Sequence, residues 1–497
     1  LAERASAHGI VLAYEALAWG RHVNDPTHAW KIVEYADHPN LGTCLDSFHV
    51  LSRGWDPAAV REIPGDKIVF LQLADAPLMA MDVLQWSRHY RCFPGQGGLD
   101  VAGLVSHALA AGYTGPLSLE IFNDVFRQSD SRRTAKDAMR SLLALEDDVS
   151  ALLPTGHVAR VELTPPRHAP APTGFAFTEV AAGPGSGLDD LLVSLGFTPA
   201  GQHRSKSVRL WQQGRARMVV NAAPEGARAG SPSLTAIGLE STDPERAAYR
   251  AEDLLSPVLP REWGEHEVRL DAVAAPDGTA LFFCRTGRSD HADWLDDFLP
   301  LTDDAATGAG ITHVDHVALT QPWSQFDEAA LFYRAVLGMQ PHDSLDLADP
   351  YGLLRSRAMA GPDNAVRIAL NVAPAGHERQ GHTSHAQHVA LACDDIVATA
   401  RILHARGAPL LAVPGNYYDD LEARYDLAPG LSTDLRELGL LYDRDEHGEF
   451  LHLYTQTVGQ VFFEVVQRVG RYAGYGAQNA SVRLTAQHTH GNAEETS

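Results

Sequence analysis

The chain has 497 residues, of which 45% are hydrophobic and 21% charged, and its formal net charge is −23. This length and composition predict a globular protein of two or three domains. The acidic balance argues against a nucleic-acid partner, because phosphates require a basic face. No apolar run approaches the roughly 18 residues of a membrane span, and from these residues we expect neither a membrane span nor a signal peptide. The absence of a long apolar run leads us to expect no membrane contact. The four cysteines lie far apart, so we expect reduced thiols and a cytoplasmic location.

The first 150 residues alternate between apolar, strand-like runs and helix-like stretches such as 26–37 and 99–113. This alternation predicts parallel βα units of an α/β domain. Because only four such units precede residue 150 and a closed barrel needs eight, we expect the C-terminal half of a (β/α)8 barrel over 1–150, with the start of the barrel missing. The strand-like runs cover residues 9–17, 41–50, 67–77 and 115–122.

A carboxylate or amide side chain stands near the end of each of these runs: Glu15, Asp46, Gln72 and Glu120. The carboxyl ends of barrel strands are where (β/α)8 enzymes keep their chemistry. Three carboxylates and one amide oxygen are hard oxygen ligands, which suit Mg, Mn or a similar divalent ion such as Co. The pattern therefore predicts a metal site in the barrel.

The second half begins after a Pro-rich connector over 151–174 and contains one pattern twice. Runs near 175, 234 and 279 resemble runs near 313, 386 and 459. The repetition predicts an α+β part built from tandem βαβββ units, with one copy over 175–305 and the next over 306–482. The last stretch, 483–497, is small and polar, and we expect it to be disordered.

The two copies differ where a metal would bind. The second copy offers His316, His388 and Glu464 on three strand-like runs. Two histidines and one carboxylate leave coordination positions open, which is usual for non-haem Fe(II). The second copy is therefore expected to bind a divalent metal, with Fe(II) the leading candidate, and the first copy none. The residues aligned with this set in the first copy are Glu179, Ala236 and Cys284.

The order of the strand-end residues, together with the segment FPGQGGLD that holds Gly95, Gly97 and Asp100, resembles the sugar-phosphate-isomerase-like TIM barrels. Within them the chain is most similar to bacterial 3-dehydroshikimate dehydratase, some members of which carry a fused module. The resemblance implies a lyase that dehydrates a small molecule, 3-dehydroshikimate, to protocatechuate in quinate and shikimate catabolism. An isomerase or epimerase of sugars or hydroxy acids uses the same metal set and is the alternative.

Dehydration of such a substrate needs a base and a group that holds its carboxylate. His49, three residues after Asp46, is the candidate base, and its alternative role is to orient a metal ligand. A carboxylate is bound by an arginine fork, which points to Arg91 first and Arg88 second, with Ser87 adding a hydroxyl contact.

The second half resembles 4-hydroxyphenylpyruvate dioxygenase, a vicinal-oxygen-chelate protein, in the segments QHVALAC, NYYDDLEARY and VFFEVVQRVG. The resemblance implies that Ser356 and Asn371 line a substrate pocket. The chain departs from the family at His452, Tyr454 and Ala480, where that family has Gln, Phe and Phe. Loss of the last ring removes a wall of the pocket.

We therefore expect no turnover of 4-hydroxyphenylpyruvate by this module. An orphan dioxygenase, a binding module that tunes the barrel and an active dioxygenase of the family type stay open as alternatives. The sequence does not decide whether the chain forms a homo-oligomer.

Overall fold

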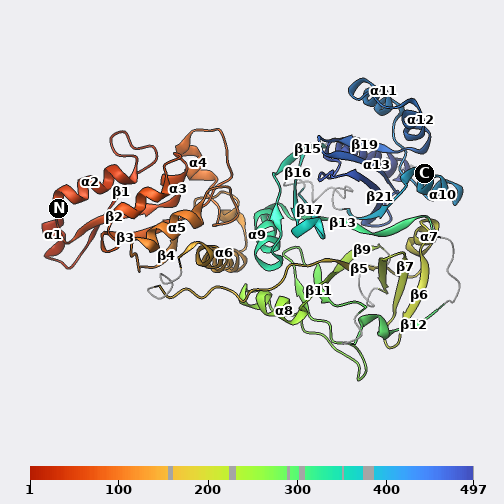
Figure 1. Cartoon of the computed structure of the whole chain (residues 1–497), viewed down its shortest axis with the longest axis horizontal. Helices are drawn as coiled ribbons and strands as arrows, with labels where there is room; N and C mark the ends of the chain where they lie inside the picture. The colour runs from red at the N-terminus through yellow and green to blue at the C-terminus, as the bar shows by residue number, and fades with distance from the viewer. Residues whose placement is uncertain are drawn as a thin grey trace. The chain divides into compact units, whose positions relative to one another are not determined.

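A computed structural model of the chain describes residues 1–154, 161–222, 231–287, 292–301, 308–349, 352–372 and 386–495 (Figure 1). These residues divide into two compact units, one formed by 1–168 with 253–255 and the other by 169–252 with 256–497. Residues 155–160 of the expected connector and 302–307 at the expected boundary between the copies lie outside the described residues.

The first unit is a half-barrel in which four parallel strands lie in the order β1-β2-β3-β4. The apolar runs form the strands, and helices connect them as parallel pairing requires. Its elements are α1 (Ala2–Ser6), β1 (Leu12–Glu15), α2 (Pro26–Ala36), β2 (Leu41–Asp46), α3 (Ser47–Leu51), β3 (Ile68–Leu73), α4 (Val83–His89), α5 (Val101–Ala110), β4 (Leu117–Leu119) and α6 (Ser131–Leu152).

Aspartates begin the helices of this unit. Asp25, Asp82, Asp100 and Asp130 each accept a backbone N–H from the first turn of α2, α4, α5 and α6. Such caps satisfy donors that a helix start leaves unpaired. A core that includes Leu71 and residues of α5 and α6 fills the space between the sheet and these helices.

The second unit contains the two expected copies, each with one curved sheet (Figure 1). The first copy has the strand order β10-β11-β9-β5-β8-β7-β6-β12. Its elements are β5 (Gly174–Ala181), α7 (Leu188–Ser194), β6 (Thr198–His203), β7 (Val208–Gln213), β8 (Ala216–Asn221), β9 (Ser233–Glu240), α8 (Pro244–Asp253), β10 (Ala272–Ala274), β11 (Ala280–Cys284) and β12 (Phe298–Pro300).

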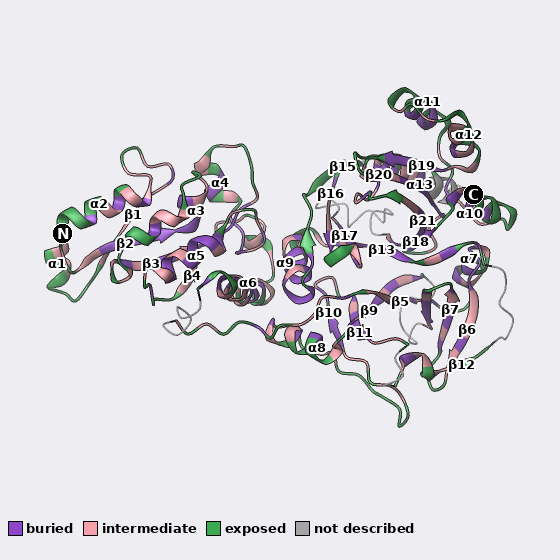
Figure 2. Ribbon diagram, in the orientation of Figure 1, coloured by how far each residue is buried: buried purple, intermediate pink, exposed green. Residues whose placement is uncertain are grey.

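The second copy has the order β14-β16-β17-β13-β18-β21-β20-β19, with β15 paired to β16. Its elements are β13 (Ile311–Gln321), α9 (Phe326–Leu337), β14 (Gln340–Pro341), β15 (Leu345–Asp349), β16 (Gly352–Ala360), β17 (Arg367–Val372), β18 (Gln387–Cys393), α10 (Ile396–Ala405), α11 (Gly415–Arg424), α12 (Pro429–Leu438), β19 (Leu441–Arg444), β20 (Gly448–Tyr454), β21 (Val461–Gly470) and α13 (Ala480–Glu495). The central strands β13, β18 and β21 and the helix α9 are largely buried (Figure 2).

The strand pairing corrects the alignment of the two copies. In the second copy Ala390 pairs with both His316 and Glu464. In the first copy the corresponding residue of β9 is Gly238, two residues after Ala236, and it pairs with Phe177 and Phe282. Glu179 and Cys284 each lie two residues after the position that pairs with Gly238. Residues two apart on a strand share a face of the sheet, so the face was predicted correctly but the position along the strand was not. The matching positions are therefore occupied by Phe177, Ala236 and Phe282.

The expected disordered tail is also wrong for most of its length, since α13 continues to Glu495. Leu484 and Ala486 are buried, and α13 contacts β15. The polar composition of this segment gave no sign that some of its residues are buried. Within the described part of the chain, no helix combines the length and apolar character needed to cross a bilayer.

Candidate active site and metal centre

The strand-end residues of the half-barrel converge. Register places Asp46 beside Gln72 and Glu15 beside Cys44, and Glu120 directly follows β4. Nε2 of Gln72 donates a hydrogen bond of 2.9 Å to Oε1 of Glu120. Sγ of Cys44 donates to Oε1 of Gln72 at 3.1 Å, which fixes the amide orientation. The four predicted ligand residues therefore lie at one edge of the sheet.

Arg91 is the centre of this cluster. Its side chain is only 1% exposed, and its Nη1 lies 2.8 Å from Oδ2 of Asp46 and 3.1 Å from Oε2 of Glu120. Nε and Nη2 both donate to Oγ of Ser87, one helical turn earlier, at 3.2 and 3.0 Å. The guanidinium also lies over the ring of Phe48, 4.8 Å from its centroid. These ion pairs, hydrogen bonds and the ring contact together fix the orientation of the Arg91 guanidinium.

His49 lies between the carboxylates. Its Nε2 is 3.4 Å from Oε1 of Glu15 and 3.9 Å from Oδ2 of Asp46, while Nδ1 accepts the amide N–H of Ala18 at 3.3 Å. Burial and the nearby Arg91 guanidinium lower the pKa of His49 to about 4. The ring is therefore neutral near pH 7. The contact of Nδ1 with Ala18 favours a proton on Nε2, the nitrogen that faces Glu15, whereas Nη2 of Arg91, 3.5 Å from Nε2, favours the other tautomer.

Negative charge is crowded at this edge of the sheet. Burial, together with the charges of Asp46 and Glu120, raises the pKa of Glu15 to about 7. Burial and a hydrogen bond with Asp46 raise the pKa of Glu120 as well. Three carboxylates face one guanidinium, so a divalent cation would balance the charge that remains. The donor set and its electrostatics fit such an ion.

The other predicted residues of the barrel differ in their surroundings. Ser87 is fully buried against Arg91, whereas Arg88 is exposed and has no carboxylate within ion-pair distance among the described residues. Sequence reasoning missed Asp75, which is buried after β3. Its carboxylate accepts the backbone N–H groups of Gly95 and Gly97 at 3.0 and 3.1 Å. The aspartate in LADAP, three residues after Gln72, was the available signal.

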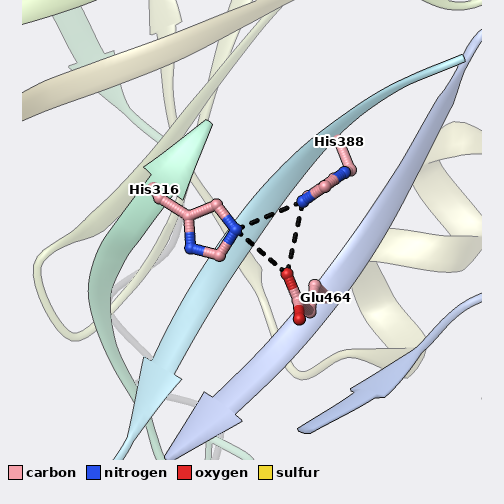
Figure 3. A group of neighbouring side chains, drawn as sticks. All are labelled: His316, His388 and Glu464. Atoms are coloured by element: carbon pink, nitrogen blue, oxygen red, sulfur yellow. Dashed lines mark hydrogen bonds and ion pairs between the residues drawn. The ribbon is translucent and has the colours of Figure 1, made fainter. Parts of the chain in front are cut away.

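His316, His388 and Glu464 come together from β13, β18 and β21 (Figure 3). The Nε2 atoms of the histidines lie 3.1 and 3.3 Å from Oε2 of Glu464 and 3.3 Å from each other. Two atoms that each bind an ion at about 2.1 Å are roughly 3.0–3.4 Å apart at octahedral or tetrahedral angles. The three buried donors therefore fit one divalent ion. Burial lowers the pKa of His388 to about 4, which keeps its ring neutral.

Polar neighbours orient two of these side chains. Oδ2 of Asp315 is 2.8 Å from Nδ1 of His316, and Arg468 holds the same carboxylate at 2.8 and 2.9 Å. This contact leaves Nε2 of His316 to face the other donors. Nδ1 of His452 is 2.6 Å from Oε1 of Glu464. Oε1 of Glu464 is therefore engaged by His452, one of the residues at which the chain departs from the dioxygenase family.

The two expected pocket residues lie farther along the same face. Asn371 pairs with Thr320 on one side and with Ser356 on the other. Thr320 and His316 are four residues apart on β13, so their side chains share a face of the sheet. Ala480 is buried at the start of α13, and the Tyr454 ring lies 6.2 Å from that of His388.

Comparison with known proteins agrees with this organisation. Residues 1–145 match the family described as xylose isomerase-like TIM barrel. Residues 169–296 match the N-terminal family of hydroxyphenylpyruvate dioxygenase, and residues 313–430 match the glyoxalase/bleomycin resistance protein/dioxygenase superfamily. The class defined by the fold is thus a xylose isomerase-like TIM barrel joined to a vicinal-oxygen-chelate module, as predicted.

The 3-dehydroshikimate dehydratase of Pseudomonas putida is 43% identical over 98% of this chain and 79% of its own length. The chain belongs to the 3-dehydroshikimate dehydratase family. A solved xylose isomerase-like TIM barrel/4-hydroxyphenylpyruvate dioxygenase fusion protein aligns with a TM-score of 0.88 and 41% identity, over 98% of this chain and 80% of that one. A 4-hydroxyphenylpyruvate dioxygenase of Pseudomonas aeruginosa is 30% identical over 65% of this chain and 94% of its own length.

Proposed function

We propose that the barrel dehydrates 3-dehydroshikimate to protocatechuate. Family membership supports the reaction, and the observation that carries it is the buried cluster in which Arg91 and His49 lie among the strand-end carboxylates. The reaction removes a proton from the carbon next to the ketone and expels the β-hydroxyl as water. A ring carbon then loses a proton while the former ketone oxygen gains one, so the net change is the loss of one water and the product is aromatic.

The residues that would hold a divalent ion, with Mg, Mn and Co as candidates, are Glu15, Asp46, Gln72 and Glu120. When bound, the ion would supply Lewis-acid stabilisation of negative charge on the substrate oxygen. Burial, and after it the neighbouring carboxylates, raise the pKa values of Glu15 and Glu120, and a bound cation would offset both effects.

His49 has two candidate roles in this scheme. As a base it takes the α-proton, for which its neutral state at pH 7 is required. The contact with Ala18 instead favours the tautomer with the proton on Nε2, and that proton would orient Glu15. Proton abstraction requires the other tautomer. The His49→Ala variant separates the two roles. If His49 is the base, the variant loses turnover and keeps its metal; if His49 orients a metal ligand, the variant loses both.

Arg91 is the proposed holder of the substrate carboxylate, together with Ser87. Its Nη1 is shared by two carboxylates, so we assign the substrate contact to Nη2, which donates to Ser87 and lies 3.5 Å from Nε2 of His49. Arg88 has a different environment, because it is exposed. We assign it a contact with the approaching substrate at most. An isomerase or epimerase would have less need of the arginine.

The second proposed activity is metal binding by His316, His388 and Glu464, with Fe(II) the leading candidate. The spacing of the three donor atoms favours it. Because His452 occupies Oε1 of Glu464, and Ala480 stands where the family has a ring, we propose that the module does not turn over 4-hydroxyphenylpyruvate. Oxygen consumption by the iron-loaded protein would distinguish an orphan dioxygenase from a binding module.

The test of the main proposal is direct. The intact protein is incubated with 3-dehydroshikimate, with either a divalent metal or a chelator, and protocatechuate is measured by chromatography. We expect product with metal and none with chelator. Product at the same rate in both samples would contradict the metal assignment, and an isomeric product would favour the alternative.

A further inference from the structure

The first repeat contains a pocket on the face of its sheet that corresponds to the metal face of the second repeat. The sheet supplies Phe177, Glu179 and Asn221 to its lining, and the segment 261–270 supplies further lining residues. All of these residues belong to the second unit. Because the ligand positions are occupied by Phe177, Ala236 and Phe282, the pocket cannot use the metal chemistry of the second repeat.

The interior wall of the pocket is aromatic. Phe177 lies 5.6 Å from Phe282 and 4.9 Å from Trp294 between ring centroids. All three rings are at most 4% exposed, and they are tilted rather than stacked on one another. Such a wall favours a flat ring, since aromatic pairs are attractive beyond the burial of their surface.

The lining of the pocket carries side chains of both charges. On the sheet, Oε1 of Glu179 accepts a hydrogen bond of 3.0 Å from Asn221. From the segment 261–270, the Arg261 guanidinium lies over the ring of Phe282, 4.4 Å from its centroid. Among the described residues, no carboxylate lies within ion-pair distance of Arg261. The other cation of the lining, Lys206, is already paired with Glu267 at 2.7 Å.

We propose that this pocket binds a single-ring aromatic carboxylate that carries a ring hydroxyl. The ring packs against Phe177, Phe282 and Trp294, the carboxylate pairs with Arg261, and the hydroxyl donates to Glu179. This set of contacts requires an anion at one end and a donor at the other. The dehydration product belongs to this class, so its choice as ligand rests on the proposed function, whereas the pocket itself does not.

The test is calorimetric titration of the intact protein with protocatechuate and with benzoate, which lacks the hydroxyls. The test variant is Arg261→Gln, and the matched control is Arg269→Gln in the same segment, whose arginine lies over Trp263 and next to Asp271 but does not line the pocket. We expect Arg261→Gln to weaken one binding event about tenfold or more, and the control to leave it unchanged. Glu179→Gln should weaken protocatechuate more than benzoate.

Equal affinities for Arg261→Gln and Arg269→Gln would overturn the proposal, as would binding that disappears in Arg91→Met, because the ligand would then occupy the barrel. The dehydration rate measured on the same samples separates the two claims. Arg261→Gln should dehydrate at the wild-type rate, so a failure of the pocket leaves the barrel assignment intact, and a protein without dehydratase activity can still show the pocket.

Discussion

Replacing Arg91 by methionine tests the cluster at the strand ends. The change keeps an unbranched, apolar stem but shortens the side chain and removes the guanidinium. The ion pair with Asp46 is then lost, and Asp46 and Glu120 face each other without a counter-charge. Both side chains of the Arg91–Asp46 pair are at most 1% exposed, so solvent screens the loss very little. Arg88→Met on the neighbouring turn is the matched control, because Arg88 is exposed.

Removing one partner of a buried ion pair costs about 3–5 kcal/mol. At roughly 2–4 °C per kcal/mol for a unit of this size, we expect the melting temperature of the barrel unit to fall by about 6–20 °C in chelator. Arg88→Met should change the stability by about 0.5 kcal/mol or less. A divalent ion supplies the missing positive charge, so saturating metal should restore part of the loss in Arg91→Met and have little effect on the difference between control and wild type.

The assay is thermal unfolding followed by circular dichroism with metal or chelator, alongside dehydration kinetics. Arg91→Met should bind metal at least as tightly as wild type, since it no longer carries a competing charge, and yet show a raised KM for the substrate. Equal unfolding of the two arginine variants in chelator would refute the reasoning. So would weaker metal binding by Arg91→Met.

The remaining predictions concern the metal ligands of the barrel, the loop that contains Gly97, and the dioxygenase-like module. Glu15→Ala or Glu120→Ala should abolish protocatechuate formation while circular dichroism stays near wild type, and full activity would remove the barrel site. Gly97→Ala should lower the melting temperature, because a Cβ would overlap the Asp75 carboxylate, whereas Gly430→Ala, with open space around it, should not. Iron-loaded protein with ascorbate should form no homogentisate from 4-hydroxyphenylpyruvate, and robust formation would contradict the lost ring wall.

Much of the half-barrel could be predicted from the sequence, because its strands are apolar runs with polar residues at their ends. The alternation of apolar runs and helices identified β1 to β4, and the positions of Asp46 and Gln72 followed from it. The long-range contacts could not be predicted. Arg91 was expected to bind the substrate carboxylate, and its pairing with Asp46, which is 45 residues away in the chain, was not foreseen. Such a contact depends on how the loop after α4 returns to the sheet.

The two repeats were recognised from similar runs, but their register was not. Alternation along a strand determines which face a side chain occupies, and Phe177 and Glu179 share that face. Only the pairing with Gly238 shows that Phe177, and not Glu179, corresponds to His316. The expected tail was wrong for a related reason, since composition alone carries no information on the contact of α13 with β15.

The most direct measurement is the conversion of 3-dehydroshikimate by the intact protein after treatment with a chelator and again after divalent metal is added back. We predict that protocatechuate forms only in the metal-supplemented sample, and that Glu120→Ala forms none in either sample. Protocatechuate formation that is unaffected by the chelator, or that persists in Glu120→Ala, would contradict the account.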